Sequence, residues 1–279
     1  MAKYSIEDTS LTAIADAIRA KTGKEDALTL DGMAAAVAGL NVAGKNVEFI
    51  GLIDRTITEA VSEDVTGVGS YAFHSCKTLE SVRFPNATNI GDYAFYGCTS
   101  LERADLSNIT SVGLNVFYGC GALESADFPK VTSVENYMFY NCKALESGNF
   151  PNAASIGTSA FQYCDALKSV DFPIAQSVGQ NAFFNCKALA SAAFPRMTSI
   201  GVQAFRQALA LTTLILSGDT VRALKAANAF ASTPIESGTG YIYVPAALVD
   251  SYKAATNWST YADQIRAIED YPDITGGAA

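Results

Sequence analysis

A 22-residue unit repeats seven times in register between Val68 and about Leu216, and this repetition constrains the fold more than any other feature. Two successive units read "IGDYAFYGCTSLERADLSNITS" and "VGLNVFYGCGALESADFPKVTS". Self-similarity at a fixed period in the low twenties is typical of a solenoid, in which each unit forms one coil of a stack. One unit is too short to bury a core of its own, so each coil must bury its apolar side chains against its neighbours.

Five apolar columns recur at equivalent positions of the units, and they predict which side chains face the interior. The columns are Val68, Ile90, Val112, Val134, Ile156, Val178 and Ile200; Phe73, Phe95, Phe117, Phe139, Phe161, Phe183 and Phe205; Cys76, Cys98, Cys120, Cys142, Cys164 and Cys186, with Ala208 in the last unit; Leu79, Leu101, Leu123, Leu145, Leu167, Leu189 and Leu211; and Phe84, Leu106, Phe128, Phe150, Phe172, Phe194 and Leu216.

Each unit is expected to contain a short strand and a turn on the opposite side. The segment "LESVRF" (Leu79–Phe84) alternates in polarity, which predicts a strand with Val82 and Phe84 inward and Arg83 outward. The Pro that follows in five units cannot donate to a strand ladder and therefore ends the strand. The segment "IGDYAFYGC" (Ile90–Cys98) predicts a turn followed by a single helical turn.

The phrase A-F-x-G-C-x-x-L-x-x-x-x-F-P, with Ile-Gly or Val-Gly before it, resembles the BspA-like (Treponema-type) leucine-rich repeat family. The resemblance covers about 150 of the 279 residues. It implies an α/β repeat solenoid, a stack of about seven coils. It also implies surface attachment and recognition, which are the functions of this family in bacteria and their phages.

The chain is predicted to divide into four parts: a helical N-terminal docking module (1–44), an N-terminal cap (45–67), the leucine-rich repeats (68–221), and a C-terminal cap and tail (222–279). In the first part, Ser10 and Thr29 are suited to cap two short amphipathic helices. The cap at 45–67 has strand character at 47–53 and 55–57 but lacks the Phe and Cys columns.

The C-terminal part is expected to begin where the repeat pattern decays. A last strand is predicted at Tyr241–Val244, followed by a helix over Ala246–Thr256 that Pro245 can start. We expect Trp258 to close the end of the stack. The phrase "YIYVPAALVDSYKAATNWSTYADQI" resembles the closing segment of phage and gut-bacterial members of the repeat family. The opening "YSIEDTSLTAIADAIRAKTG" looks like the N-terminal segment of tail and baseplate-associated proteins of phages of Gram-positive bacteria.

Composition and charge exclude several partners. A net charge of −9 with no basic patch argues against nucleic acid. No apolar run approaches the roughly 20 residues that span a membrane, so no membrane insertion is expected. Asp8 and Asp16 interrupt any apolar core at the start of the sequence, which predicts a protein made in the bacterial cytoplasm without a signal peptide.

The six cysteines are predicted to be buried, unbridged thiols. All lie 22 residues apart in one column, and the sequence contains no C-x-x-C pair. The single histidine, His74, stands two residues before Cys76, but the other five cysteines have no such neighbour, so a nucleophile pair is not expected. The sequence also lacks the common phosphate-binding, serine-hydrolase and zinc-protease motifs. It therefore predicts no enzyme, no cofactor and no metal.

Two exposed surfaces are candidates for binding. An aromatic face is predicted on the turn side, beside His74 and Phe184, and comprises Tyr71, Tyr93, Tyr96, Tyr118, Tyr137 and Tyr140. Such rings suit the recognition of glycan or protein, and they suit equally the role of half-buried spacers between coils. An acidic strand face is the second candidate, able to attract cations or a basic partner unless it is simply a solvated surface; it comprises Glu80, Glu102, Asp105, Glu124, Asp127, Glu146 and Asp171.

These features favour a non-enzymatic phage virion component, in a tail fibre or baseplate, that uses the solenoid for host attachment. Residues 1–44 would then join other virion proteins, the rod would contact a host-surface glycan or protein, and a homo-oligomer is expected in the assembly. One alternative is a bacterial cell-surface adhesin of the same family, which would need an export signal and an anchor. Another is an intracellular protein-binding scaffold.

Overall fold

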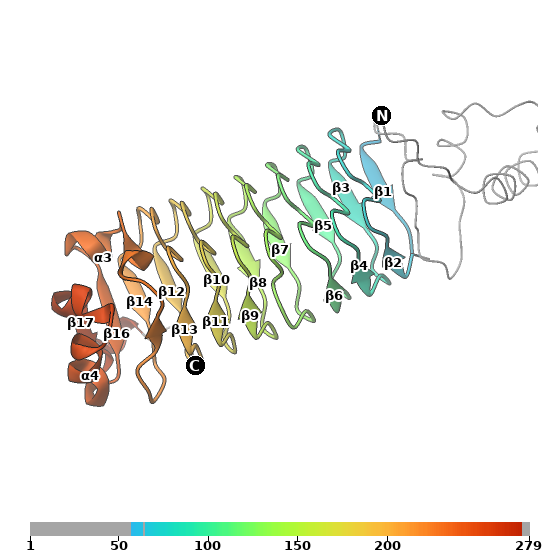
Figure 1. The fold of residues 1–279 in the computed structure, drawn as a ribbon. Coiled ribbons are helices and arrows are strands. Elements are labelled where there is room, and N and C mark those ends of the chain that lie inside the picture. Colours follow the sequence, from blue (N-terminus) through green and yellow to red (C-terminus); the bar gives the residue numbers. More distant parts are fainter. Residues whose placement is uncertain (1–56, 64, 275–279) are drawn as a thin grey trace, which may run out of the picture.

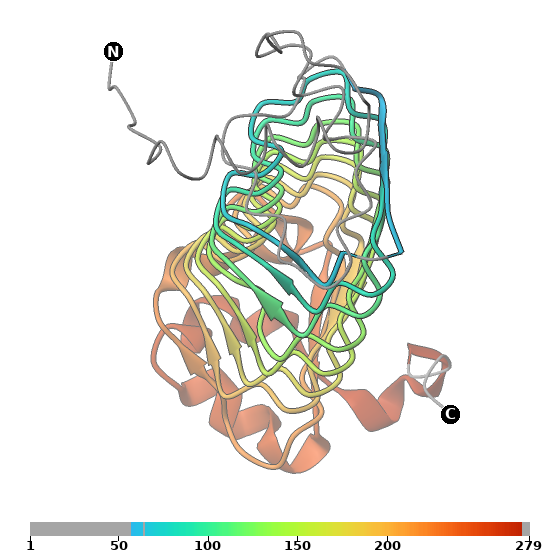
Figure 2. The same cartoon turned by 90° about the vertical axis from the view of Figure 1, so that its right-hand side faces the viewer.

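The protein is an elongated solenoid whose coils lie side by side from β1 to β17 (Figure 1). The computed structural model describes residues 57–63 and 65–274. The predicted N-terminal helices and the strand predicted at 47–53 lie outside the described residues. Viewed along the stack, successive coils have closely similar outlines (Figure 2), which is the result expected when equivalent positions of each unit occupy equivalent places.

Two rows of short parallel strands run along the stack. The first row contains β1 (Glu59–Val61), β3 (Ser81–Arg83), β5 (Arg103–Asp105), β7 (Ser125–Asp127), β8 (Ser147–Asn149), β10 (Ser169–Asp171), β12 (Ser191–Ala193), β14 (Thr213–Ile215), β16 (Tyr241–Val244) and β17 (Ile265–Ala267). The second contains β2 (Gly67–Val68), β4 (Asn89–Ile90), β6 (Ser111–Val112), β9 (Ser155–Ile156), β11 (Ser177–Val178), β13 (Ser199–Ile200) and β15 (Ala223–Leu224).

Strand register follows the 22-residue period. Val82 of β3 pairs with Ala104 of β5, and Ile90 of β4 pairs with Val112 of β6. Within β3, Val82 is buried and Arg83 is exposed, as the alternating pattern predicts. The predicted α/β leucine-rich-repeat solenoid is therefore confirmed as the fold class. The exact boundaries of the four predicted parts stay predictions.

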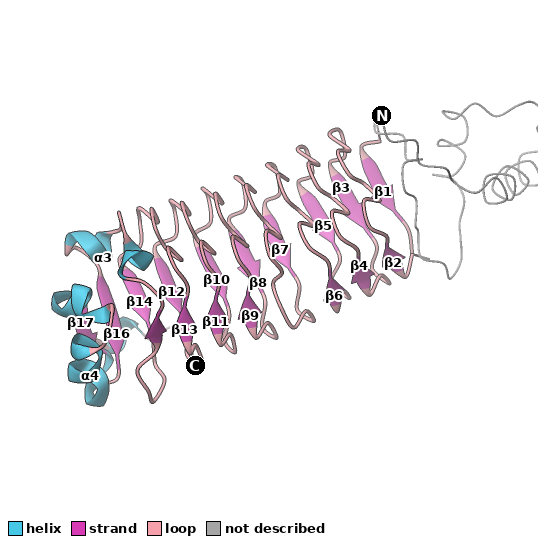
Figure 3. Ribbon diagram, in the orientation of Figure 1, coloured by secondary structure: helices cyan, strands magenta, loops and turns pink. Residues whose placement is uncertain are grey.

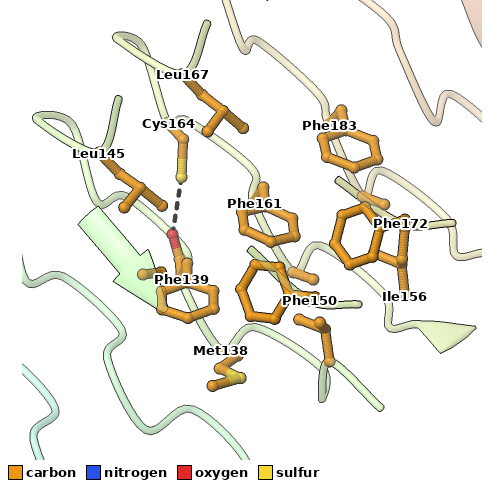
Figure 4. Close-up of a cluster of buried hydrophobic side chains, with 14 of the residues drawn as sticks. Met138, Phe139, Leu145, Phe150, Ile156, Phe161, Cys164, Leu167, Phe172 and Phe183 are labelled. Carbon is orange, nitrogen blue, oxygen red and sulfur yellow. Dashed lines mark hydrogen bonds between the residues drawn. The ribbon is translucent and has the colours of Figure 1, made fainter. Parts of the chain in front are cut away.

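The core consists of aromatic rings stacked from coil to coil. Phe139 and Phe161 have ring centroids 5.2 Å apart, and Phe161 and Phe183 follow at 5.3 Å (Figure 4). A second row alongside contains Phe150 and Phe172, with centroids 5.1 Å apart. All five rings are buried. Each coil thus buries its own rings only because the next coil covers them.

The cysteine column adds a hydrogen bond to this packing. Cys164 donates its Sγ–H to the carbonyl oxygen of Phe139, 25 residues earlier, at 3.1 Å (Figure 4). Cys98, Cys120, Cys142 and Cys186 make the equivalent bond at 3.0–3.1 Å. All six cysteines are free and buried, so the prediction of buried, unbridged thiols is confirmed.

The predicted helical turn in each unit is wrong. Residues 92–97 form hydrogen-bonded turns, and two positions of each such segment have positive φ. Tyr93 has φ 56° and Gly97 has φ 71°. A helix requires negative φ throughout. The two positive-φ positions instead keep this segment in turns between the second-row strand and the following first-row strand, as in 92–97 between β4 and β5. The first is occupied by Tyr71, Tyr93, Asn115, Tyr137, Ser159, Asn181 and Gln203, and the second by Ser75, Gly97, Gly119, Asn141, Tyr163, Asn185 and Gln207.

A column of glycines lets the second row of strands approach closely. The amide of Gly157 donates to the carbonyl of Val134 at 2.8 Å, and a Cβ on Gly157 would lie 2.7 Å from the backbone nitrogen of Asn136. Gly113 makes the same bond to Ile90. Glu135 holds the equivalent position in the fourth unit, and among the described residues its amide has no such partner. The Cβ of Glu135 explains why the strands separate here, because the glycine positions of the other coils have no room for a Cβ.

Both rows of strands are interrupted at this same junction. β5 and β7 belong to different sheets, and β6 ends the sheet that begins with β2. Among the described residues, one backbone bond still crosses this place on the strand side, from the amide of Glu124 to the carbonyl of Glu102 at 3.2 Å. The turn side stays continuous, and there the amides of Phe117 and Gly119 donate to the carbonyls of Met138 and Tyr140 at 2.9 and 2.7 Å. We call this place, between the coils that carry β5–β6 and β7, the open junction.

Helices gather at the C-terminal end of the described chain (Figure 3). They are η1 (Ala227–Phe230), α3 (Pro234–Ser237), η2 (Ala246–Leu248), α4 (Val249–Ala254), η3 (Trp258–Gln264), η4 (Ile268–Asp270) and η5 (Pro272–Ile274). The predicted strand Tyr241–Val244 is confirmed as β16. The helix predicted over Ala246–Thr256 is instead split into η2 and α4, and the strand β17 was not predicted.

Trp258 closes the end of the stack, as expected. Its ring is buried, its Nε1–H donates to the carbonyl of Arg222 at 2.7 Å, and it meets Tyr252 edge to face. Phe230 continues the main ring column, with its centroid 5.6 Å from that of Phe205. Over the part of the chain described, the structure contains no helix with the length and apolar character needed to cross a membrane.

Candidate functional site

The predicted aromatic face forms a continuous row on the turn side of the solenoid. Along it, His74 stacks on Tyr96 at 5.0 Å, Tyr96 on Tyr118 at 4.7 Å and Tyr118 on Tyr140 at 4.5 Å between ring centroids. Interplanar angles are 3–12°. We call the whole set the aromatic ridge; it comprises Tyr71, His74, Tyr93, Tyr96, Tyr118, Tyr137, Tyr140, Tyr163 and Phe184.

A second column of rings leans on the first. Tyr71 stacks on Tyr93 at 5.0 Å, and Tyr137 tilts against Tyr140 at 5.9 Å. Tyr71 and Tyr137 are the most exposed, at 46% and 37%, whereas the other ridge rings are half-buried. The six tyrosines predicted as one face are therefore brought together on one side of the rod.

Stacking decides which part of each ring a partner can reach. A ring held between parallel neighbours has both faces covered, so it presents its edge and, for Tyr, its hydroxyl. Burial raises the pKa of Tyr118, with a further contribution from Tyr96, and burial also raises the pKa of Tyr140. Both hydroxyls therefore stay protonated at neutral pH and can donate hydrogen bonds. Most of the ridge offers edges and donors, not open ring faces.

The parallel stack ends at Tyr140. The next ring, Tyr163, lies at 89° to Tyr140 with centroids 5.4 Å apart, and Phe184 lies at 81° to Tyr163. At this change of direction the surface has a shallow hollow of about 380 Å³. The hollow is lined by Tyr140, Asn141, Lys143, Tyr163, Asp165, Asn185 and Lys187. Tyr140 and Tyr163 thus meet edge to face and both line the hollow.

Charges in the hollow are partly neutralised. Lys187 Nζ lies 3.1 Å from Asp165 Oδ2, and Asn185 Nδ2 donates to Asp165 Oδ1 at 3.3 Å. Lys143 forms no ion pair with any described residue. The hollow therefore has a net positive charge on a chain whose net charge is −9.

The acidic strand face is only partly a bare carboxylate surface. Asp105 lies 3.3 Å from Arg83, and Glu146 lies 2.7 Å from Lys168. Asp127 accepts a hydrogen bond from Asn149 at 2.8 Å, and Glu102 lies 3.9 Å from Arg103. Ion pairs and hydrogen bonds thus occupy four of the seven acidic residues, although exposed pairs of this kind stabilise a fold little because solvent screens them. The other three, Glu80, Glu124 and Asp171, have no charged partner among the described residues.

Two other candidate chemistries find no support in the geometry. The Nδ1 atom of His74 lies 3.0 Å from the hydroxyl of Ser75, and its ring stacks on Tyr96, while Cys76 is buried. Over the described ranges, no group of three or more His, Cys, Asp or Glu side chains is arranged to hold a metal ion. The aromatic ridge with its hollow is therefore the better candidate site.

Short parallel strands that recur every 22 residues, with inward columns of Leu, Phe and Cys, define a leucine-rich-repeat solenoid. Residues 56–168 and 154–239 match the model of the BspA type leucine rich repeat region. These matches cover more than half of the chain, so the chain belongs to the BspA-type leucine-rich-repeat family. Proteins of this repeat class are generally non-enzymatic scaffolds that bind other proteins, and the matches indicate no catalytic family.

Solved structures share the fold. A leucine-rich repeat protein of T. pallidum matches with a TM-score of 0.52 and 25% identity, over 57% of this chain and 79% of that one. A leucine-rich repeat protein of Bacteroides ovatus matches with a TM-score of 0.50 and 22% identity, over 76% of this chain and 66% of that one. No curated protein matches the chain.

Six of the seven residues that line the hollow were not among the predicted site residues: Asn141, Lys143, Tyr163, Asp165, Asn185 and Lys187. Tyr163 stands one position past the column of Tyr140, so the ring column did not include it. Lys143, Asp165 and Lys187 are spaced 22 residues apart, and that spacing is the signal that could have brought them together.

Proposed function

We propose that this protein is a non-enzymatic attachment protein whose aromatic ridge contacts a polymer on the surface of a bacterial cell. The observation that carries the proposal is the unbroken row of half-buried rings from His74 to Tyr140, held at centroid spacings of 4.5–5.0 Å. Tyrosine presents a large contact area with little conformational entropy to lose on binding, and such rings often dominate the energetics of interfaces.

A phage tail or baseplate is the proposed setting. The supporting observations are the sequence resemblance of residues 4–23 to phage tail proteins and of residues 241–265 to phage and gut-bacterial repeat proteins. In this proposal residues 1–44 join other virion proteins, and the ridge remains available along the rod. Mass spectrometry of purified particles is the test. Protein found on the surface of the producing cells, and missing from the particles, would favour the adhesin alternative.

Binding by the ridge can be tested without disturbing the turns. Tyr71, Tyr93 and Tyr137 occupy a positive-φ position at which the same solenoid uses Asn115 and Asn181. Asn is among the residues that adopt this conformation most readily. The triple variant Tyr71→Asn, Tyr93→Asn, Tyr137→Asn should therefore fold normally. Because it lacks three aromatic contacts, we expect it to bind a panel of Gram-positive cells and their purified walls about tenfold more weakly or worse.

The matched control removes charge from the other candidate surface. Glu80→Gln with Glu124→Gln changes two carboxylates of the acidic strand face that have no charged partner among the described residues. Pull-down and flow cytometry should give wild-type binding for this variant. Loss of binding in the glutamine variant, with full binding in the asparagine variant, would assign recognition to the strand face and reject the ridge.

A further inference from the structure

The hollow at the end of the ring stack contains an aromatic residue at a turn position that has no ring in the other coils. Tyr163 has φ 65°, at a position that other coils fill with Ser75, Gly97, Gly119, Asn141, Asn185 and Gln207. A bulky side chain in the left-handed region is an outlier, and such strain concentrates at functional sites. Of the seven described residues at this position, Tyr163 alone has an aromatic side chain, and it holds that ring in a conformation that bulky residues rarely adopt.

The orientation of the Tyr163 ring suggests a role for this residue in binding. Tyr163 lies perpendicular to Tyr140, so it interrupts the parallel stack and lines the hollow. A volume of about 380 Å³ is at the lower end of the range for small-molecule pockets, about 300–1,000 Å³. It is suited to one or two ring-sized groups and not to a helix or a folded domain.

The polar lining narrows the chemistry of the occupant. Asn141 and Asn185 provide amides, and the Asp165 carboxylate, already bonded to Lys187, has further lone pairs. Hydroxyl groups, which both donate and accept, match such a mixed lining. Lys143 adds a cation without a carboxylate partner among the described residues, and it calls for one negative charge on the ligand.

We propose that the hollow binds an acidic sugar residue of a surface polysaccharide, with the sugar ring against Tyr140 and Tyr163 and its carboxylate at Lys143. This inference rests on the proposed function, because it names the ligand class recognised at the end of the ridge. The amides of Asn141 and Asn185 and the carboxylate of Asp165 bind the sugar hydroxyls. The stacked part of the ridge then contacts the polymer beyond this residue.

Two variants and two controls test the proposal in the full chain by isothermal titration. Tyr163→Asn introduces asparagine, the residue found at the equivalent position of the neighbouring coils as Asn141 and Asn185. The thermal unfolding midpoint of this variant should therefore not fall. Lys143→Gln removes the cation at an exposed position. Lys77→Gln is the matched control, since Lys77 holds the same place three units earlier, outside the hollow. Gln207→Asn is the position control, because Gln207 has positive φ at the place equivalent to Tyr163 two units later, outside the hollow.

The probes are an α-1,4-linked galacturonic acid trimer and 3′-sialyllactose, each compared with a neutral counterpart, namely the carboxyl-reduced trimer and lactose. At least one acidic probe should bind the wild type about tenfold more tightly than its counterpart, as one charge-assisted contact predicts. Lys143→Gln should erase that preference and leave neutral binding unchanged. Tyr163→Asn should weaken both members of the pair about tenfold, and the two controls should change neither.

Several results would overturn the proposal. Equal affinity for acidic and neutral probes in the wild type would remove the role of the cation, and a preference that survives Lys143→Gln would do the same. Tight, Tyr163-dependent binding of the peptide Gly-Asp-Gly, with none of the sugars, would assign the hollow to acidic peptides. Ridge-dependent adhesion to cells without any probe binding would sink this inference alone. Probe binding without adhesion would instead reject the proposed function.

Discussion

At the scale of single residues, the cysteines show how one small side chain joins two coils. Cys142 is buried, and its Sγ–H donates to the carbonyl of Phe117, which also accepts the amide hydrogen of Cys120. Each such carbonyl thus receives one bond from its own coil and one from the next. Burial raises the pKa of the Cys120, Cys142, Cys164 and Cys186 thiols above the ordinary value of 9.0.

These thiols should be inert in the native protein. The thiolate is the reactive form, and burial both disfavours it and blocks access. We expect all six cysteines to resist a maleimide reagent at pH 7–9 and to react within minutes of unfolding in guanidinium, as read by intact mass. Because the folded pKa is raised, the contribution of these thiols to stability is complete below pH 9 and is lost as pH rises above it.

A mass corresponding to disulfides in the untreated protein would contradict this expectation, as would labelling of the native state that accelerates between pH 7 and 9. Cys142→Ala supplies a useful comparison, because Ala208 already occupies this column in the seventh unit. Its loss of one methylene-sized contact and one hydrogen bond should lower stability by about 1–3 kcal/mol.

The burial of the column side chains could be predicted directly from residue identity, whereas the sign of the backbone φ angle in the turns could not. The spacing of Phe139, Cys142 and Leu145 predicts three inward side chains, and all three are buried. The left-handed conformation of Tyr163 was not predictable, because a tyrosine carries no preference for it. Only comparison with Gly119 and Asn141 at the same place in other units hints that this position needs positive φ.

At the scale of the strands, the glycine column controls how closely coils approach. The prediction is that Gly157→Ala opens a second junction, since its Cβ would lie 2.7 Å from Asn136 N, and that it costs about 1–3 kcal/mol. The reverse change, Glu135→Gly, should close the existing gap. Amide hydrogen exchange is the measurement: the amide at 135 should exchange quickly in the wild type and become protected in the glycine variant.

Gly113 provides the internal reference, because its amide already donates to Ile90 at 2.8 Å and should be protected in every variant. If residue 135 exchanges as slowly as Gly113 in the wild type, then the open junction is closed in solution. If Glu135→Gly leaves exchange unchanged, the side chain is not what separates the coils.

The strands followed from the alternation of Val82 and Arg83, but the predicted helical turn did not form. "IGDYAFYGC" contains good turn residues at both ends, and a unit of 22 residues leaves too few for a helix between them. In the sequence, the fourth unit is the one copy that lacks glycine at this position. Glu135 stands there, between Gly113 of the third unit and Gly157 of the fifth. The effect of Glu135 on both rows of strands could not be predicted, because it depends on packing between neighbouring coils and not on the sequence of one unit.

At the scale of the whole molecule, the stack has no weak C-terminal coil. Leu211 belongs to the last regular unit, yet it is as fully buried as Leu145, because β16 pairs with β14 and Phe230 covers Phe205. An aspartate at either position would place an unpaired charge in the core. We therefore expect Leu145→Asp and Leu211→Asp to cost about 4 kcal/mol or more each, measured by denaturant unfolding.

The exposed neighbour Thr212→Asp is the control and should stay within about 0.5 kcal/mol of wild type. A much smaller cost for Leu211→Asp would mean that the C-terminal helices detach readily and leave the seventh unit as a fraying end. The repeat period was sufficient to predict the rod and its interior. The cap was harder, because β17 and the split helices η2 and α4 follow no repeat.

The open junction also has a mechanical consequence. Coils in single file carry a pull along the axis in series, so the rod is only as strong as the junction with the fewest backbone bonds. At the open junction the turn side, where Phe117 and Gly119 donate to Met138 and Tyr140, carries most of the load. Tension between the two ends would part the strand side there first and bend the rod toward the ridge. The rings of the aromatic ridge would then keep their spacing while the strand side of the junction separates.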